Sequence, residues 1–166
     1  MSKLAFIPLP TDQVHSLQRG GKDADGNTPE EHISDGNGKP CRHCLTEIAA
    51  GEKYLIIALR PFSSRQPYAE QGPIFLHADE CIAYDSTDRL PQMYDSRDSL
   101  LLRGYCAEER IVYGTGQTVK PKEVDTIAKK ILQMENVAYV HARSSANNCY
   151  QFRIEADNQT SEAGEE

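Results

Sequence analysis

Two short motifs constrain this chain more than any other feature, because together they carry the ligands for one metal ion. Cys41 and Cys44 form a C-x2-C pair, and His77 and Cys81 form an H-x3-C pair after 32 intervening residues. Thiolates and an imidazole at such spacings are typical of tetrahedral zinc sites. Four protein ligands leave no vacant position for water or substrate, so the sequence predicts a structural zinc ion without catalysis at the metal.

The flanking residues indicate how the two pairs would meet. His77 ends an expected strand over 73–77, and Asp79 is placed to cap a short helix over 79–84 that holds Cys81 in its first turn. His43 is an alternative ligand, although the sequence favours its pointing to solvent. Two other interpretations are reduced cysteines without a metal and a redox C-x-x-C motif. The redox motif is disfavoured because Cys41 follows a glycine-rich loop rather than a strand.

The charge of the chain is uneven and excludes several classes of partner. The formal net charge is −7, but residues 155–166 hold five carboxylates and no basic residue. The rest of the chain has 20 acidic and 18 basic residues, so it offers no basic footprint for nucleic acid or an anionic membrane surface. We therefore expect no membrane partner and disfavour nucleic acid, while a small anionic ligand and a protein partner stay open.

The compartment is predicted from the cysteines and the N-terminus. The first ten residues have a short apolar run that Pro8 and Pro10 interrupt, unlike a secretory signal. No stretch reaches the roughly 20 apolar residues of a membrane span. Paired cysteines in such a chain bind metal more often than they form disulfides. We expect a cytoplasmic protein.

Hydrophobic periodicity predicts an α+β fold, with a mostly antiparallel sheet and one main helix at about 122–134. Val124, Ile127, Ala128, Ile131 and Leu132 form a single apolar stripe at helical spacing. A short helix is expected over 11–17, and strands over 4–8, 53–60, 73–77, 100–105, 110–113, 137–143 and 149–154. These elements indicate a single domain over 1–155 with a long glycine-rich loop at 18–40, followed by a disordered acidic tail at 156–166.

A second candidate site lies outside the metal motif. It consists of five polar residues on or beside expected strands, namely Arg60, Glu70, Arg103, His141 and Arg143. Charged residues in strands are seldom buried alone, so an ion pair between Glu70 and one arginine is the simpler explanation. The alternative is a pocket for a small anion, because arginine binds carboxylate or phosphate through two parallel hydrogen bonds.

The turn between the last two strands leaves their register open. A two-residue turn at Ala146 and Asn147 would place His141 opposite Phe152 and Arg143 opposite Tyr150. A three-residue loop would place the same two residues opposite Gln151 and Cys149.

Several motifs taken together resemble a family of small bacterial proteins known only as a domain of unknown function. They are P-C-R-H-C-L at 40–45, P-F at 61–62, P-Y-A-E at 67–70, G-P-I-F-L-H at 72–77 with Cys81, L-R-G-Y at 102–105 and V-H-A-R-S at 140–144. The resemblance covers about residues 4–155 and implies a single-domain bacterial protein, without supplying catalytic residues. Locally, F-L-H-A-D-E-C resembles the ligand segment of treble-clef zinc fingers.

Three functions are compatible with these features. The leading hypothesis is a zinc-stabilised domain without enzymatic activity. The first alternative is a small-anion binding protein or an enzyme that uses the arginine, histidine and glutamate pocket. The second is a protein-interaction module whose surface includes the 18–40 loop. The sequence does not decide whether the chain is an enzyme.

Overall fold

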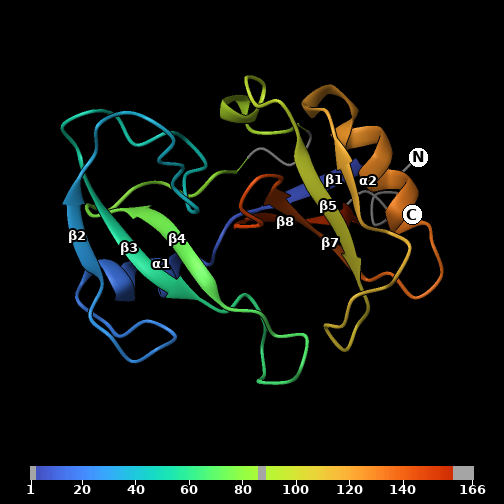
Figure 1. The fold of residues 1–166 in the computed structure, drawn as a ribbon, viewed down its shortest axis with the longest axis horizontal. Coiled ribbons are helices and arrows are strands. Elements are labelled where there is room, and N and C mark those ends of the chain that lie inside the picture. Colours follow the sequence, from blue (N-terminus) through green and yellow to red (C-terminus); the bar gives the residue numbers. More distant parts are fainter. Residues whose placement is uncertain (1–2, 86–88, 159–166) are drawn as a thin grey trace, which may run out of the picture.

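The computed structural model, which describes residues 3–85 and 89–158, has two antiparallel sheets and two α-helices (Figure 1). The five-stranded sheet has the order β1-β8-β7-β5-β6 and the three-stranded sheet the order β2-β3-β4. The strands are β1 Lys3–Ile7, β2 Glu30–Ile33, β3 Lys53–Leu59, β4 Gly72–His77, β5 Leu100–Tyr105, β6 Gln117–Val119, β7 Tyr139–Ser144 and β8 Tyr150–Asp157. The prediction of an α+β fold with antiparallel sheets is confirmed.

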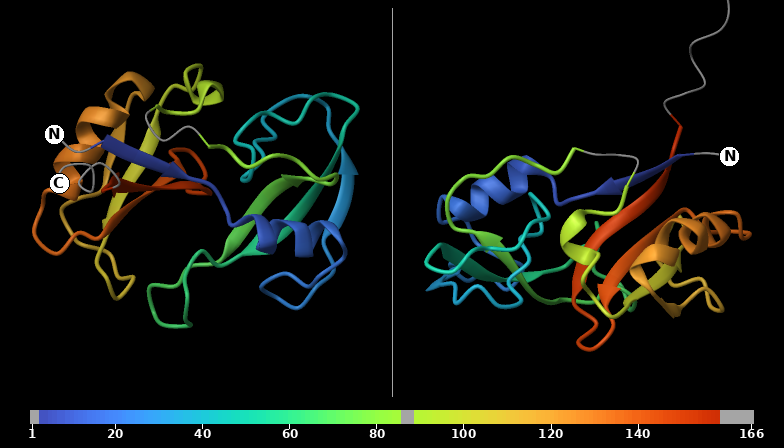
Figure 2. Two further views of the ribbon diagram at one scale, coloured as in Figure 1. Left: turned by 180° about the vertical axis from the view of Figure 1, so that it is seen from behind. Right: turned by 90° about the horizontal axis from the view of Figure 1, so that it is seen from above.

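The main helix covers one face of the five-stranded sheet. Helix α2 spans Val124–Leu132 and is preceded by a 3₁₀ turn at Pro121–Glu123, so the predicted helix is present with a tighter first turn. Its stripe buries Val124, Ala128 and Ile131 against apolar side chains of β5, β7 and β8. Figure 2 shows α2 on the side of this sheet that faces away from the three-stranded sheet. No helix in the described ranges is long and apolar enough to cross a membrane.

The three-stranded sheet has its own apolar core. Helix α1 spans Thr11–Gln18 and lies beside the three-stranded sheet (Figure 2). It buries Val14 and Leu17 in a cluster with Leu55, Ile57 and Leu76 of β3 and β4. Strand β3 lies at the centre of this sheet, as its apolar sequence predicts. Pro10 precedes the first turn of α1, whereas Thr11 and Asp12 lie inside the helix.

Residue Arg42 joins the two sheets. Its backbone N–H donates to the carbonyl of Phe75 on β4, at 3.1 Å. Its side chain donates from Nε to the carbonyl of Tyr150 on β8 and from Nη1 to that of Pro40, both at 2.7 Å. The side chain is almost fully buried, and the burial lowers the pKa of the guanidinium, which nevertheless stays charged. The hydrogen bonds to carbonyls compensate for the lost hydration of a buried cation.

Three predicted elements are wrong. Residues 79–84 form no helix, because this segment runs extended past the cysteine motif and Tyr84 N–H donates to the His43 carbonyl at 3.0 Å. Residues 110–113 form only one bridge, between Ile111 and Tyr105, and the edge strand is β6 instead. The 18–40 loop is interrupted by β2, whose charged and fully exposed sequence lacks a strand pattern.

Strand β8 extends into the segment predicted as an acidic tail. Strand β8 continues to Asp157 because β1 provides hydrogen-bonding partners for it, with Lys3 opposite Asp157 and Leu4 opposite Ala156. Residues 159–166, on which most of the predicted disordered tail falls, lie outside the described residues.

The observed register agrees with neither predicted alternative along its whole length. Arg143 lies opposite Tyr150, as a two-residue turn predicts, but His141 lies opposite Arg153. The difference is a β-bulge next to Ala142 and Arg143, where β8 has one extra residue, Gln151. Because of the bulge, His141 and Arg143 lie on the same face of β7 although the register of β8 changes between them.

Replacing Arg42 should destabilise the whole fold. We expect Arg42→Ala to lower the free energy of unfolding by about 3 kcal/mol, because two carbonyls lose charged donors inside the protein. Urea unfolding measures the change. The control is Arg19→Ala, which removes an exposed ion pair with Glu80 and should change stability by less than about 0.5 kcal/mol. Equal effects of the two substitutions would contradict this role of Arg42.

Candidate metal centre

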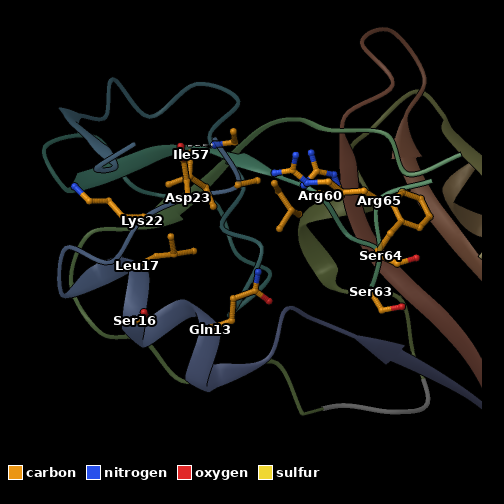
Figure 3. A pocket seen from close by; sticks show the side chains of 14 residues that line it. Gln13, Ser16, Leu17, Lys22, Asp23, Ile57, Arg60, Ser63, Ser64 and Arg65 are labelled. Carbon is orange, nitrogen blue, oxygen red and sulfur yellow. Dashed lines mark hydrogen bonds between the residues drawn. The ribbon is translucent and has the colours of Figure 1, made fainter. Parts of the chain in front are cut away.

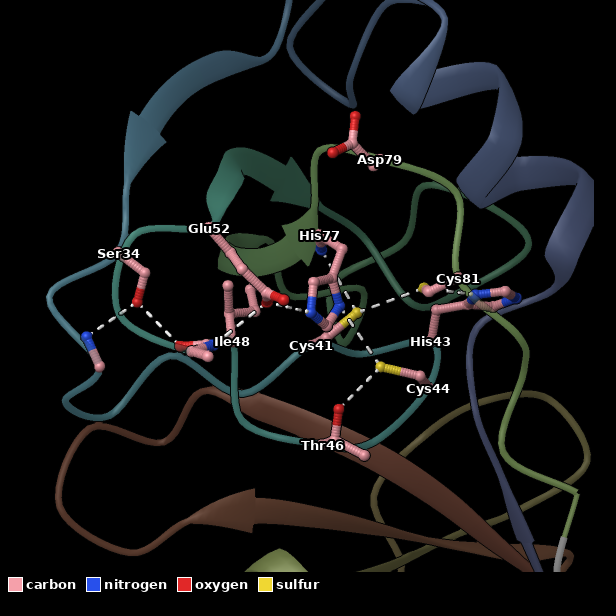
Figure 4. A network of polar contacts seen from close by, with 12 residues as sticks. Ser34, Cys41, His43, Cys44, Thr46, Ile48, Glu52, His77, Asp79 and Cys81 are labelled. Carbon is pink, nitrogen blue, oxygen red and sulfur yellow. Dashed lines mark hydrogen bonds and ion pairs between the residues drawn. The ribbon is translucent and has the colours of Figure 1, made fainter.

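The two predicted ligand pairs meet at one point. One ligand atom from each of Cys41, Cys44, His77 and Cys81 lies within 4.8 Å of the other three. The Sγ atoms of Cys41 and Cys81 are 3.9 Å apart, and Cys44 Sγ is 3.4 Å from His77 Nδ1. Figure 4 shows these side chains pointing toward one another from the 41–44 knuckle, the end of β4 and the segment after it.

The separations agree with a tetrahedral site and not with a disulfide. A tetrahedron with metal–sulfur bonds of about 2.3 Å and metal–nitrogen bonds of about 2.05 Å has edges of about 3.8 Å between sulfurs and about 3.6 Å between sulfur and nitrogen. A disulfide needs an S–S distance of about 2.05 Å, and none of the five cysteines in the described part of the chain forms one. The cluster could therefore hold a metal ion.

The backbone of the knuckle directs its two sulfurs to the same side. Leu45 N–H donates to the Cys41 carbonyl at 3.0 Å, and Cys41 N–H donates to the Thr46 carbonyl at the same distance. Leu45 closes this turn with a positive φ of 54°, a conformation that its buried side chain secures by packing in the core. The tight turn brings Cys41 and Cys44 together before any ion is bound.

Each sulfur also contacts a donor that is not itself a ligand atom. Cys41 Sγ accepts from the His77 backbone N–H at 3.3 Å, and Cys44 Sγ lies 3.1 Å from the Thr46 hydroxyl. Cys81 Sγ lies 3.1 Å from His43 Nδ1. Such contacts stabilise thiolates by spreading their negative charge.

His43 is buried, so the expectation that it points to solvent is wrong. Its Nε2 lies 2.9 Å from the Thr11 hydroxyl on α1, and its Nδ1 faces Cys81. Burial lowers the pKa of this imidazole. A neutral ring that donates from Nδ1 to sulfur and accepts at Nε2 satisfies both contacts. His43 therefore contacts the cluster through Cys81 Sγ and is not one of the four candidate ligands.

Glu52 orients the histidine ligand. Its Oε2 lies 3.1 Å from His77 Nε2, while His77 Nδ1 faces Cys44. A carboxylate on the far nitrogen of a metal-binding histidine fixes the tautomer and makes the near nitrogen a better ligand. Among the described acidic residues, Glu52 is the one that contacts this ring.

The side chains of the cluster shift one another's pKa because they lie close together. Hydrogen bonds to Cys41 and Cys44 raise the pKa of His77 to about 10. Hydrogen bonds with Cys41 and Cys81 lower the pKa of Cys44, and hydrogen bonds with Cys41 and Cys44 raise the pKa of Cys81. Without a metal, the candidate ligands thus hold their protons with different affinities. A bound cation would displace them, because thiolates and a neutral imidazole are the ligating forms.

Part of the second predicted site also comes together. Arg103 Nη2 donates to Glu70 Oε1 at 3.0 Å, and Arg143 Nη1 lies 3.6 Å from Glu70 Oε2. Arg143 Nη2 is 3.2 Å from His141 Nδ1. The ion pair expected for Glu70 is present. Because the Glu70 carboxylate already pairs with Arg103 and Arg143, this part of the predicted pocket is filled by the protein's own side chain.

Arg60 lies apart from this network. Its Nη2 donates to the amide oxygen of Gln71 at 2.6 Å, and no carboxylate within the described ranges pairs with it. It shares a different hollow with His141, next to Phe62 and Arg153. The five predicted residues therefore divide between a closed ion-pair network and an open hollow, with His141 at the boundary.

The sequence did not predict the roles of several residues at these sites. Glu52 and Thr46 belong to ordinary polar stretches with no motif. His43 and Arg42 occupy the two variable positions of C-x2-C, so their place was visible but their orientation was not. Arg153 could have been found only from the register of β8, which the bulge changes.

Comparison with known proteins identifies a family but no activity. A family model described as "Protein of unknown function (DUF1203)" matches residues 38–156. No curated protein and no solved structure matches the chain. The matched region contains all four candidate ligands and the polar residues around His141.

The buried His141 should make the fold sensitive to acid. Burial, with the guanidiniums of Arg143, Arg153 and Arg103, holds the pKa of His141 well below its usual value. Below about pH 6.5 the unfolded chain then binds a proton that the folded chain excludes, so stability falls as the pH falls. Between pH 7.5 and 5 this loss should be about 2 kcal/mol greater for the native chain than for His141→Gln in urea unfolding. Identical pH profiles of the two proteins would refute this assignment.

Proposed function

The chain belongs to the DUF1203 family, whose description assigns no activity, and from its own residues we propose that it is a domain stabilised by one structural zinc ion. Cys41, Cys44, His77 and Cys81 would be the ligands, without catalysis at the metal. The observation that carries the proposal is the closed cluster of three sulfurs and one imidazole nitrogen. These soft and borderline donors suit zinc, whereas magnesium and calcium prefer oxygen.

The surroundings of the cluster support a structural ion. Four ligands fill a tetrahedral zinc site and leave no position for a reacting water. Three thiolates and one zinc ion carry a net charge of −1, and each sulfur has a donor that reduces this charge. Glu52 completes the carboxylate–histidine pair that is common at zinc sites.

The ion would connect segments that are far apart in sequence. It would link the knuckle to the end of β4 and to the extended segment that holds Cys81, all within the three-stranded half of the protein. The resemblance to a treble clef stays a prediction, because Cys81 does not lie on a helix. Through Arg42 the same knuckle contacts β8, which supports treating 1–155 as one domain. Thiolate ligands persist best in a reducing compartment, so we place the protein in the cytoplasm.

Purified protein should contain one zinc ion per chain. We expect Cys44→Ser to lose this zinc and to be less stable, because metal binding in such sites contributes directly to folding. Mass spectrometry of metals measures the content, and thermal unfolding measures the stability. The control is Cys106→Ser, which removes a half-buried cysteine outside the cluster and should keep full zinc content.

Two results would contradict the proposal of a structural zinc ion. One is native protein without metal whose stability does not change on addition of zinc. The other is zinc that Cys44→Ser retains in full. A bound iron or other ion in place of zinc would contradict the identity of the metal.

Glu52 should tune the affinity for the ion. We expect Glu52→Gln to weaken zinc binding by about 10- to 100-fold, because His77 loses the carboxylate that orients it. Competition with a chromophoric chelator measures the affinity. Glu31→Gln is the matched control, since its exposed carboxylate on β2 pairs with Lys53. A Glu52 variant that binds zinc as tightly as this control would exclude the proposed role of the contact between Glu52 and His77.

A further inference from the structure

Two adjoining hollows lie on the side of β3 that faces α1 and the five-stranded sheet. One has a volume of about 440 Å³ and is shown in Figure 3; the other has about 420 Å³ and reaches His141. They share four lining residues, namely Gln13, Leu59, Arg60 and Phe62. The two hollows are therefore parts of one groove, with Arg60 and Phe62 at the junction.

The inner end of the groove presents a hydrogen-bond donor. His141 is 1% exposed, and its Nδ1 lies 3.2 Å from Arg143 Nη2. A guanidinium can only donate, so Nδ1 accepts and the proton of the neutral ring is on Nε2. No hydrogen bond from this Nε2–H to a side chain or carbonyl is found within residues 3–85 and 89–158, and Nε2 is not one of the fully buried unpartnered atoms there, so it is open to the hollow that His141 lines. It can therefore donate a hydrogen bond to an acceptor of a ligand in that hollow.

The inner end is also aromatic. The ring centroid of His141 lies 5.3 Å from Phe62, 4.6 Å from Tyr105, 5.2 Å from Tyr139 and 4.8 Å from Tyr150. Phe62 and Tyr150 line the hollow together with His141. Flat apolar walls favour a flat apolar group in the ligand.

The outer end of the groove, away from His141, is positively charged, although the chain has a net charge of −7. It is lined by three basic side chains, Lys22, Arg60 and Arg65, and one acidic side chain, Asp23, whereas Arg153 and Glu155 line the inner end. Both acids are already engaged: Asp23 accepts hydrogen bonds from backbone N–H groups, including that of Ala58, and Glu155 pairs with Arg153.

Arg60, Arg65 and Lys22 pair with no carboxylate in the described part of the chain, since Arg60 contacts the neutral Gln71 and Lys22 the hydroxyl of Thr28. The two arginines are the cations that can bind an anion through parallel hydrogen bonds. Figure 3 shows both on the same side of the hollow, opposite Lys22 and Leu17. Two neighbouring guanidiniums repel each other in water and gain most from a shared anion.

We propose that this groove binds a small organic anion with a flat apolar body. Its carboxylate or phosphoryl group lies between Arg60 and Arg65, and its body extends over Phe62 toward the Nε2–H of His141. This site is separate from the metal cluster. It also differs from the pocket expected from sequence, because Glu70 pairs with Arg103 and Arg143, and Arg143 contacts His141.

Titration calorimetry of the zinc-loaded protein tests the site with phenyl phosphate and benzoate, which separate the phosphoryl and carboxylate forms of the anion. Inorganic phosphate tests the charged end alone, and benzyl alcohol the flat body alone. We expect one of the two aromatic anions to bind at least about ten-fold more tightly than either partial ligand. Arg60→Gln should weaken its binding about ten-fold or more, since one charged contact is lost. Arg19→Gln, the same change at an exposed arginine outside the groove, should leave binding unchanged.

Phe62→Ala separates the two ends of the groove. It should weaken binding of the aromatic anion and leave binding of inorganic phosphate unchanged, and zinc content together with thermal unfolding checks that each variant is folded. No binding of either aromatic anion would overturn the proposal. So would equal binding of benzyl alcohol and the anions, or affinity that Arg60→Gln does not change.

Discussion

The fold depends on three consecutive residues, Cys41, Arg42 and His43, which bond to both halves of the molecule. Their backbone contacts β4, the segment before α1 and the segment after β4, and the Arg42 side chain reaches β8. Cys41 is a candidate metal ligand, Arg42 is a buried cation and His43 is a buried imidazole. Burial lowers the pKa of the Arg42 guanidinium, and the carbonyls of Tyr150 and Pro40 accept hydrogen bonds from this buried cation.

The five-stranded sheet has two chemically different faces. Along β7, Val140 and Ala142 point toward α2, whereas Tyr139, His141 and Arg143 point toward the other half of the protein. The first face forms the core that stabilises the sheet. The second is polar and aromatic although it is buried, and it faces the groove between the halves. This division explains why a conventional helix–sheet core and an unusual buried histidine occur on one strand.

The sequence predicted regular elements well where burial follows a clear period. The stripe of α2 and the apolar run of β3 are recognisable because one packed face decides each pattern. The errors fall where contacts from distant residues decide the conformation. Residues 79–84 carry helix signals but stay extended along the knuckle, and the charged β2 is a strand only because β3 provides its hydrogen bonds. The bulge at Gln151 likewise has no local signature.

By itself the sequence determined the α+β class and which side chains can bind a metal, since both follow from residue type and short-range spacing. The four candidate ligands are found where the C-x2-C and H-x3-C pairs predict. The tertiary structure alone decided what surrounds them. It placed Glu52 against His77 and His43 against Cys81, and it paired Glu70 with Arg103 and Arg143, whereas Arg60 has no carboxylate partner among the described residues. Such partners are chosen by packing between segments that are distant in sequence, and no periodicity along the chain records that choice.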